Sequence, residues 1–201
     1  MSRSANRRRA QFGSSLIEVL VTLVILMLGL LGLVGLMVQS QRAQFESYQR
    51  VQALLMLDDM VNRIQTNHQA AACYVLTTGS DGTPFLGVGS MGVPACPTSI
   101  ASAAQRALAA QDLNDWNQLL QGAGEQISTV GGKVDAGTMI GARGCIQLIS
   151  DGLYQVSVVW QGRGATLAPI GVNCANGLYD TGGADAQRRA VSVNVRIISL
   201  S

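Results

Sequence analysis

The stretch RRRAQFGSSLIEVLVTLVILMLGLLGLVGLMVQ, residues 7–39, decides how the rest of this 201-residue chain is interpreted. It opens with three arginines and continues into residues 16–38, where only Glu18 and Thr22 are polar. At about 1.5 Å per residue, a helix of this length spans roughly 35 Å, which is enough to cross a hydrocarbon core of about 30 Å. The sequence contains no second stretch of this kind, so we predict a single membrane span.

The charges that flank the span predict its orientation. Four arginines and no acidic residue occur within residues 1–13, whereas only Arg42 follows the span closely. Cytoplasmic flanks of membrane spans carry the excess of arginine and lysine, so the N-terminus is expected in the cytoplasm and the rest of the chain outside. The whole chain has 14 basic and 12 acidic residues. Residues 14–201 keep ten of the basic and all 12 of the acidic residues, so their net side-chain charge is −2. No basic patch therefore remains to indicate nucleic-acid binding.

Three interpretations of the apolar segment follow from its composition. A secretory signal peptide has an apolar region of about 7–15 residues that ends at a small-residue cleavage site, and this run is longer and has no such site. A plain membrane anchor would leave Glu18 in the lipid headgroup region. A processed segment would instead be cut ahead of the apolar run, at Gly13.

The run QFG-SSLIEVLVTLVIL, residues 11–26, resembles the leader of type IV prepilins. That leader is short and basic, ends in glycine, and precedes an apolar helix with glutamate as the fifth mature residue. The resemblance implies that a prepilin peptidase cuts after Gly13 and methylates the new amine of Ser14. Most family members begin the mature chain with phenylalanine, so Ser14 is a departure from the pattern.

Glu18 would lie one helical turn beyond the free amine of Ser14 in the processed chain. A carboxylate in an apolar environment needs a partner. Within one chain that partner could be its own amine or the positive end of the helix dipole. The resemblance implies instead the amine of a neighbouring subunit in a staggered stack, which makes Glu18 a candidate assembly residue.

The sequence after the span predicts that the helix continues. Residues 38–67 contain neither proline nor glycine, so we expect one helix of about 50 residues. Apolar residues at helical spacing predict that one face of its outer part packs on a folded head. These residues are Phe45, Tyr48, Leu54, Leu57, Val61 and Ile64.

A second helix is predicted within residues 98–124, with Thr98 or Ser99 as the N-terminal cap and Gly122 as the stop. Asp112 is a possible start of a further short helix within this stretch. Three side chains are expected to pack inward: Trp116, Leu119 and Leu120.

The last third of the chain has the pattern of an antiparallel sheet. Residues 145–150 and 153–160 flank Asp151-Gly152, a strong signal for a two-residue hairpin. A third strand is expected within residues 188–200 and a fourth within 126–140, while 77–99 and 161–185 have loop composition. Val191, Val193, Val195 and Ile197 should share one face of the third strand. We therefore predict an α+β fold, in which a long transmembrane and amphipathic helix packs on a head with an antiparallel sheet.

All four cysteines fall on the predicted outer side of the membrane. An even number in an oxidising compartment favours disulfides, and four cysteines allow three pairings. We favour Cys73–Cys96 and Cys145–Cys174, because each pairing ties a long loop to an ordered element. Zinc is disfavoured, because there is no C-x-x-C pair and the chain has a single histidine, His68.

Three further segments resemble the PilV-like minor pilins of type IV pili: LLMLDDMVNRIQTN (54–67), VVWQG (158–162) and RRAVSVNV (188–195). The resemblance implies a minor pilin that helps to initiate pilus assembly and supports twitching motility and adhesion. Its implied partners are prepilin peptidase, the other minor pilins, the major pilin, the assembly machinery of the inner membrane and a tip adhesin. Before assembly it would be a single-pass inner-membrane protein with a periplasmic head, and after assembly it would be part of the pilus at the cell surface.

The implied organisation is a leader (1–13), the transmembrane half of the helix (14–39), its outer half (40–72) and the globular head (73–201). The alternatives are a minor pseudopilin of a type II secretion system and a signal-anchored periplasmic enzyme or binding protein. No catalytic set, metal-ligand set or cofactor motif is recognisable, so we predict that the chain is not an enzyme and needs neither cofactor nor metal.

Overall fold

The computed structural model describes residues 15–135, 137, 139–180 and 184–197. A long N-terminal apolar helix is followed by a head with a four-stranded antiparallel sheet, which is the predicted α+β architecture. The chain divides into two compact units, residues 1–45 and residues 46–201. We call the second the head unit. Helix α1 (Leu16–Thr66) begins in the first unit and ends in the second.

One face of α1 enters the core of the head unit. Its buried residues recur every three or four positions, as expected for one side of a helix: Gln49, Ala53, Leu57, Met60 and Ile64. The predicted face was only partly right. Leu57 and Ile64 are buried and Val61 is half-buried, but Tyr48 and Leu54 are 48% and 46% exposed. The buried stripe passes through a polar and a small residue, which a search for large apolar side chains does not select.

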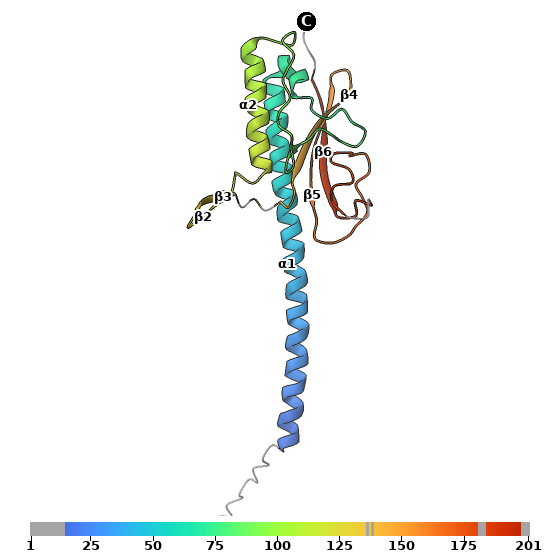
Figure 1. Cartoon of the computed structure of the whole chain (residues 1–201). Helices are drawn as coiled ribbons and strands as arrows, with labels where there is room; N and C mark the ends of the chain where they lie inside the picture. The colour runs from blue at the N-terminus through green and yellow to red at the C-terminus, as the bar shows by residue number, and fades with distance from the viewer. Residues whose placement is uncertain (1–14, 136, 138, 181–183, 198–201) are drawn as a thin grey trace, which may run out of the picture. The chain divides into compact units, whose positions relative to one another are not determined.

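Helix α2 (Ala103–Leu120) lies beside the outer part of α1 (Figure 1). It begins one turn later than predicted, because Ser102 and Gln105 form a reciprocal capping box at its N-terminus. Gly122, with a φ of 99°, follows the helix as the predicted stop. Asp112 does not start a second helix, since α2 runs through it without interruption. Trp116 and Leu120 are buried as predicted, and Leu119 is half-buried.

The main sheet has the strand order β1-β4-β5-β6, and all of its pairs are antiparallel. Strands β4 (Arg143–Ser150) and β5 (Leu153–Gln161) form the predicted hairpin, with Gly152 at a φ of 66° in its turn. Strand β6 (Arg188–Arg196) pairs with β5 along its whole length. Val191 and Val195 are buried on its core face, whereas Val193 is 37% exposed.

The sequence predicted that residues 126–140 would supply the fourth strand, but they do not contribute to this sheet. Those residues form β2 (Gln126–Thr129) and β3 (Gly132–Asp135), which pair only with each other in a separate sheet. The fourth strand is instead β1 (Leu86–Gly87), which lies inside the predicted loop 77–99 and pairs with Arg143 and Gly144. The short 3₁₀ helix η1 (His68–Tyr74) connects the end of α1 to that loop.

Gly144 lets α2 and the sheet come close together. A Cβ atom at this position would overlap the Trp116 ring and lie 2.8 Å from Leu120 Cδ1. Trp116 is fully buried, and its indole N–H donates to the carbonyl of Met56 at 2.9 Å, so the ring joins α2 to α1 as well. Any side chain at position 144 must therefore displace a residue that is fixed on both sides.

We predict that Gly144→Ala lowers the free energy of unfolding by about 1–3 kcal/mol, the range for overpacked cores. Gly164→Ala is the matched control, because an added Cβ there meets nothing within 4 Å. Denaturant unfolding of the full-length chain in detergent measures both. Equal stabilities for the two variants would contradict the close approach.

Candidate functional site

The start of α1 is a capped helix with an acid in its first turn. The Glu18 amide donates to the carbonyl of Ser15 at 2.9 Å and to its hydroxyl at 3.3 Å, which satisfies a free donor of the helix start. The exposed Glu18 carboxylate has no hydrogen-bond or ion-pair partner among the described residues. The predicted cleavage and methylation positions, Gly13 and Ser14, lie outside the described residues.

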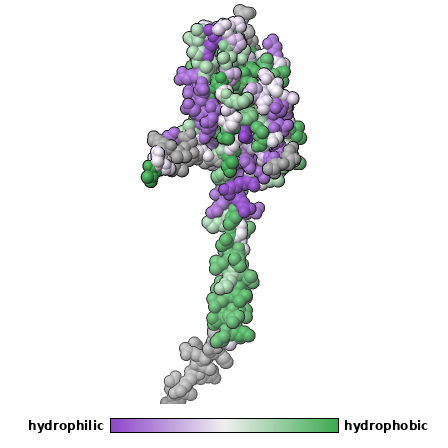
Figure 2. Space-filling model, viewed as in Figure 1, coloured by the Kyte–Doolittle hydropathy of each residue, from purple (hydrophilic) through white to green (hydrophobic). Residues whose placement is uncertain are grey.

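The following residues present an apolar surface on every side of the helix. Their large side chains are between 43% and 84% exposed. Figure 2 shows this part of α1 as a nearly continuous hydrophobic surface on the face in view. The exposed residues are Leu16, Ile17, Val19, Leu20, Val21, Leu23, Val24, Ile25, Leu26, Met27, Leu28, Leu30, Leu31, Leu33, Val34, Leu36, Met37 and Val38. A helix that is apolar all round is stable in a membrane or when surrounded by other helices.

Polar groups within this surface are few, and all but one are satisfied within the helix. The Thr22 hydroxyl donates to the carbonyl of Val19 at 2.8 Å, so it needs no partner from outside. Glycines 29, 32 and 35 bring no polar side chain, and a Cβ added at any of them would meet nothing within 4 Å. Glu18 is therefore the one side chain in residues 16–38 that requires a partner from another molecule, from solvent or from residues outside those described.

The outer end of α1 is fixed to the rest of the head unit by a partly buried polar network. Arg63 Nε lies 2.8 Å from Asp59 Oδ2, and Arg63 Nη1 lies 2.9 Å from Asp112 Oδ1 on α2. The second Asp112 oxygen accepts a hydrogen bond of 2.6 Å from the buried Tyr74 hydroxyl of η1. The sequence analysis considered Asp112 only as a possible helix start, because its partner Arg63 lies 49 positions away in the chain.

Burial and neighbouring charges keep both Tyr74 and Arg63 protonated in this network. Burial, and then the hydrogen bond to Asp112, raise the pKa of Tyr74 well above its usual value, so the phenol remains a donor. Burial alone would lower the pKa of Arg63, but its bonds to Asp59 and Asp112 outweigh that effect and raise it. The network therefore contains a permanent cation, and Tyr74 acts as its neutral donor.

The four cysteines form the two disulfides that the sequence analysis favoured. Cys73–Cys96 joins η1 to the end of the first long loop, and Cys145–Cys174 joins β4 to the second. In the chain-entropy model, closing loops of 23 and 29 residues contributes about 3–4 kcal/mol each. These bonds shape the head unit, and they leave α1 residues 16–38 unconstrained.

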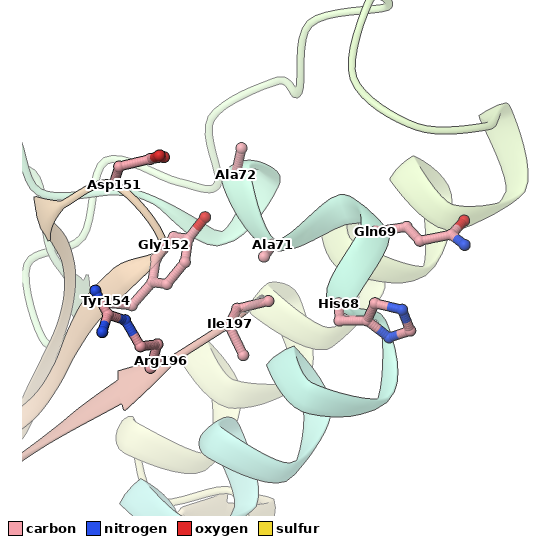
Figure 3. Close-up of a pocket in the computed structure, with 9 residues that line it drawn as sticks. All are labelled: His68, Gln69, Ala71, Ala72, Asp151, Gly152, Tyr154, Arg196 and Ile197. Atoms are coloured by element: carbon pink, nitrogen blue, oxygen red, sulfur yellow. The ribbon is translucent and has the colours of Figure 1, made fainter. Parts of the chain in front are cut away.

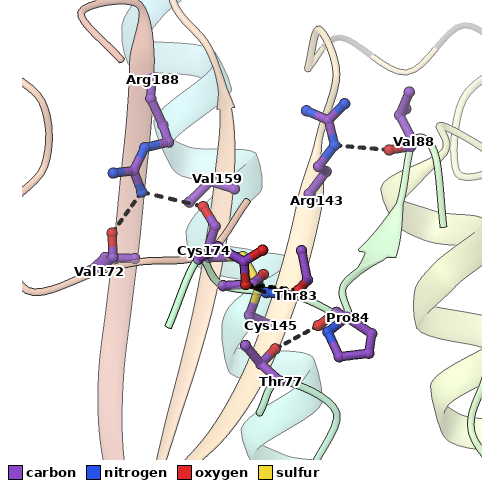
Figure 4. The surroundings of a disulfide bond; sticks show 12 residues. Thr77, Thr83, Pro84, Val88, Arg143, Cys145, Val159, Val172, Cys174 and Arg188 are labelled. Carbon is purple, nitrogen blue, oxygen red and sulfur yellow. Dashed lines mark hydrogen bonds between the residues drawn. A yellow bond between two sulfur atoms is a disulfide. The ribbon is translucent and has the colours of Figure 1, made fainter. Parts of the chain in front are cut away.

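The second loop, residues 162–187, is further held by side chains that the sequence did not single out. Figure 4 shows Arg188 beside Cys145–Cys174, where its Nη1 donates to the carbonyls of Val172 at 2.6 Å and Cys174 at 3.2 Å. Arg188 Nε lies 2.9 Å from Asp185 Oδ2, and both side chains are almost fully buried. The loop therefore has the fixed polar anchors of a folded segment, although its composition is typical of an irregular one.

Tyr179 fixes the same loop to the start of β4. Its hydroxyl donates to the carbonyl of Gly141 at 2.7 Å, and the Arg143 guanidinium lies 4.8 Å from the centre of its ring. Burial raises the pKa of Tyr179 to about 12, so the donor persists throughout the physiological range.

Comparison with known families identifies the start of the chain. Residues 8–34 match the family model described as the prokaryotic N-terminal methylation motif. The match covers the last six residues of the predicted leader and most of the exposed apolar surface of α1, including Glu18. No curated protein and no solved structure matched the chain in the other two comparisons.

The chain thus carries a prepilin-type leader ahead of an apolar helix and a pilin-like α+β head. Helix α1 is long and apolar enough to cross a membrane, and it is the only such helix in the part of the chain that the structure describes. This combination fits a type IV pilin or pseudopilin that is anchored in a membrane, and it points to a structural role.

We predict that Asp112→Ala lowers the free energy of unfolding by about 2–4 kcal/mol, because it leaves the Tyr74 hydroxyl and Arg63 without their buried acceptor. Asp58→Ala removes an exposed carboxylate from the same region of α1, for which we expect a change within about 0.5 kcal/mol. Denaturant unfolding with both disulfides intact measures the difference. If the two variants lose the same stability, the network does not hold α1 to α2.

Proposed function

We propose that the chain is a minor pilin of a type IV pilus, cleaved after Gly13 by a prepilin peptidase and methylated at Ser14. One observation carries the proposal. The methylation motif covers the start of a helix whose apolar surface is exposed on all sides, and the same helix ends inside a separately packed head unit. Such a chain needs a membrane before assembly and other apolar helices after it.

The role proposed for Glu18 follows from its position. Cleavage after Gly13 creates a positive amine at Ser14, four residues before Glu18 and therefore about one helical turn away. A carboxylate among apolar helices is stabilised when it pairs with such an amine. Pairing with the amine of a neighbouring subunit would set the axial position of one helix against the next, which is the proposed function of Glu18 in assembly.

The proposed cleavage site and the apolar helix define four segments: a leader (1–13), a transmembrane half of the helix (14–39), its outer half (40–72) and a globular head (73–201). The head would be periplasmic before assembly and exposed on the pilus afterwards, consistent with its two disulfides. The proposed partners are prepilin peptidase, the other minor pilins, the major pilin, the inner-membrane assembly machinery and a tip adhesin. Twitching motility and adhesion are the proposed cellular roles.

A minor pseudopilin of a type II secretion system would use the same leader and helix. The segments at 54–67, 158–162 and 188–195 that resemble PilV-like minor pilins favour the pilus. Subunits that co-purify with the chain from membranes distinguish the two proposals, since pilus subunits support the first and secretion-system pseudopilins support the second.

Gly13→Val tests the processing step. A β-branched side chain should not fit a peptidase site that accepts glycine, so the membrane fraction should contain only the precursor. Intact mass spectrometry of the variant and the unmodified chain gives the result. A variant that still loses residues 1–13 would contradict the prepilin assignment.

Glu18→Ala tests assembly apart from cleavage. Membrane level and mature mass should stay unchanged, because the arginines and Gly13 remain, while recovery in sheared surface fibres should fall roughly tenfold. Thr22→Val is the control, since its hydroxyl bonds only within the helix, and its recovery should match that of the unmodified chain. Recovery of Glu18→Ala at the same level as this control would show that the carboxylate has no role in assembly.

A further inference from the structure

No strand of the described residues pairs with the outer edge of β6. The Gly162 amide donates to the carbonyl of Gln187, and the Ile197 amide donates to the carbonyl of Gly152, both at 2.8 Å. Odd-numbered residues of β6 therefore direct their backbone groups toward β5, and the even-numbered Ser192 and Asn194 direct theirs away from it. Among the described residues, none bonds to the backbone N–H or C=O of Ser192 or Asn194.

The start of the same edge is covered by the chain itself. The Thr166 amide donates to the carbonyl of Ala186 at 2.7 Å, and Arg189 Nη2 donates to the carbonyl of Gly164 at 2.8 Å. In the described part of the chain this cover ends at Arg189, which leaves residues 190–196 as the open part of the edge. Its sequence, AVSVNVR, has no proline, glycine, lysine or acid, and its register with β5 contains no bulge. It therefore lacks the usual devices that prevent another strand from pairing.

The core is also incompletely covered beside this edge. Val193 shares the core face of β6 with Val191 and Val195, which are 8% and 6% exposed, yet Val193 itself is 37% exposed. The opposite face carries Ser192 and Asn194, both exposed and polar. A strand that pairs with β6 and alternates apolar with polar side chains would cover Val193 and keep its polar side in water.

A hollow of about 490 Å³ lies at the end of the open edge, between the β4–β5 turn and η1. Its lining includes Arg196 at the end of β6, Ile197 directly after it, Tyr154 from β5, Asp151 from the turn and Ala72 from η1 (Figure 3). Tyr154 is only 7% exposed, and its hydroxyl has no hydrogen-bond partner among the described residues. The hydroxyl faces the hollow, where it is available to donate to an acceptor from another molecule.

We propose that the open edge of β6 and this hollow together form a docking site for an extended strand of another subunit. The backbone of that strand would pair with Ser192 and Asn194, and one apolar side chain would cover Val193. A side chain with a carbonyl or carboxylate oxygen would enter the hollow and accept from Tyr154. The inference rests on the proposed function, because it takes the strand to come from another protein of the same fibre.

Photo-crosslinking in cells tests the site on the full-length chain. The probe is p-benzoylphenylalanine in place of Asn194, and mass spectrometry maps the residues to which it attaches. We expect adducts to an extended segment of another pilin-type subunit. Attachment mainly to a second copy of this chain, or to helices alone, would overturn the proposal.

Two variants in the crosslinking strain separate docking from folding. Ser192→Pro removes an outward N–H that β5 does not use, so adducts should fall about tenfold, whereas Ser192→Ala keeps the N–H and should leave them unchanged. Tyr154→Phe removes a hydroxyl without a partner in the described structure, so the free chain should keep its stability while adducts fall about fivefold. Adduct yields that are equal in all variants would overturn the docking site.

The N-terminal mass of the chain in the same cells separates the two proposals. A chain that is cut after Gly13 and recovered in fibres, but gives no adduct at position 194, contradicts only the docking site. A chain that keeps residues 1–13 contradicts the proposed function, whatever adducts it forms.

Discussion

Burial of one face of α1 within the head unit is the interaction on which the rest of that unit depends. Residues from this face belong to the same apolar cluster as residues from η1, α2 and the main sheet. Polar contacts then fix the arrangement, since Arg63 reaches α2 through Asp112 and Tyr74 reaches the same carboxylate from η1. Without this face of α1, neither α2 nor the sheet would have a surface on which to bury its apolar side chains.

The part of α1 that precedes the head unit exposes its apolar side chains instead of burying them. From Leu16 to Val38 its large side chains are exposed, and they would be unstable in water on this scale. Exposed apolar surface of this extent is stable only in lipid or against other apolar helices. The prepilin-type motif lies on this part of the chain, and a fibre subunit needs both environments in turn. Glu18 is the exception within this surface, and in the proposed function a neighbouring subunit supplies the partner that offsets its cost.

Features determined by local pattern could be predicted from the sequence, and features determined by distant partners could not. The apolar run predicted α1, and Asp151-Gly152 predicted the β4–β5 hairpin. Strand β1 was missed because its two residues, one of them a glycine, have no strand pattern of their own and are defined by pairing with Arg143 and Gly144. Gln49 was missed in the core face of α1 because a buried polar residue can be recognised only once its surroundings are known.

In the candidate site, too, local patterns could be recognised in the sequence and long-range contacts could not. Glu18 and Gly13 could be proposed from the sequence because the prepilin-type leader that they resemble is a local pattern. The open edge of β6 and the unpartnered hydroxyl of Tyr154 could not be found from the sequence, since an edge exists only after strand order is fixed. Asp112 was misread as a helix start because its partners, Arg63 and Tyr74, come from two other elements.

The central claim is that the apolar helix is a processed assembly element. The most direct test is the mass of the N-terminal peptide of the unmodified chain, isolated from sheared surface fibres. The account predicts a peptide that begins at Ser14 and carries one added methyl group. A chain that is absent from the fibres, or that retains Met1 or an unprocessed leader in the membrane, would contradict it.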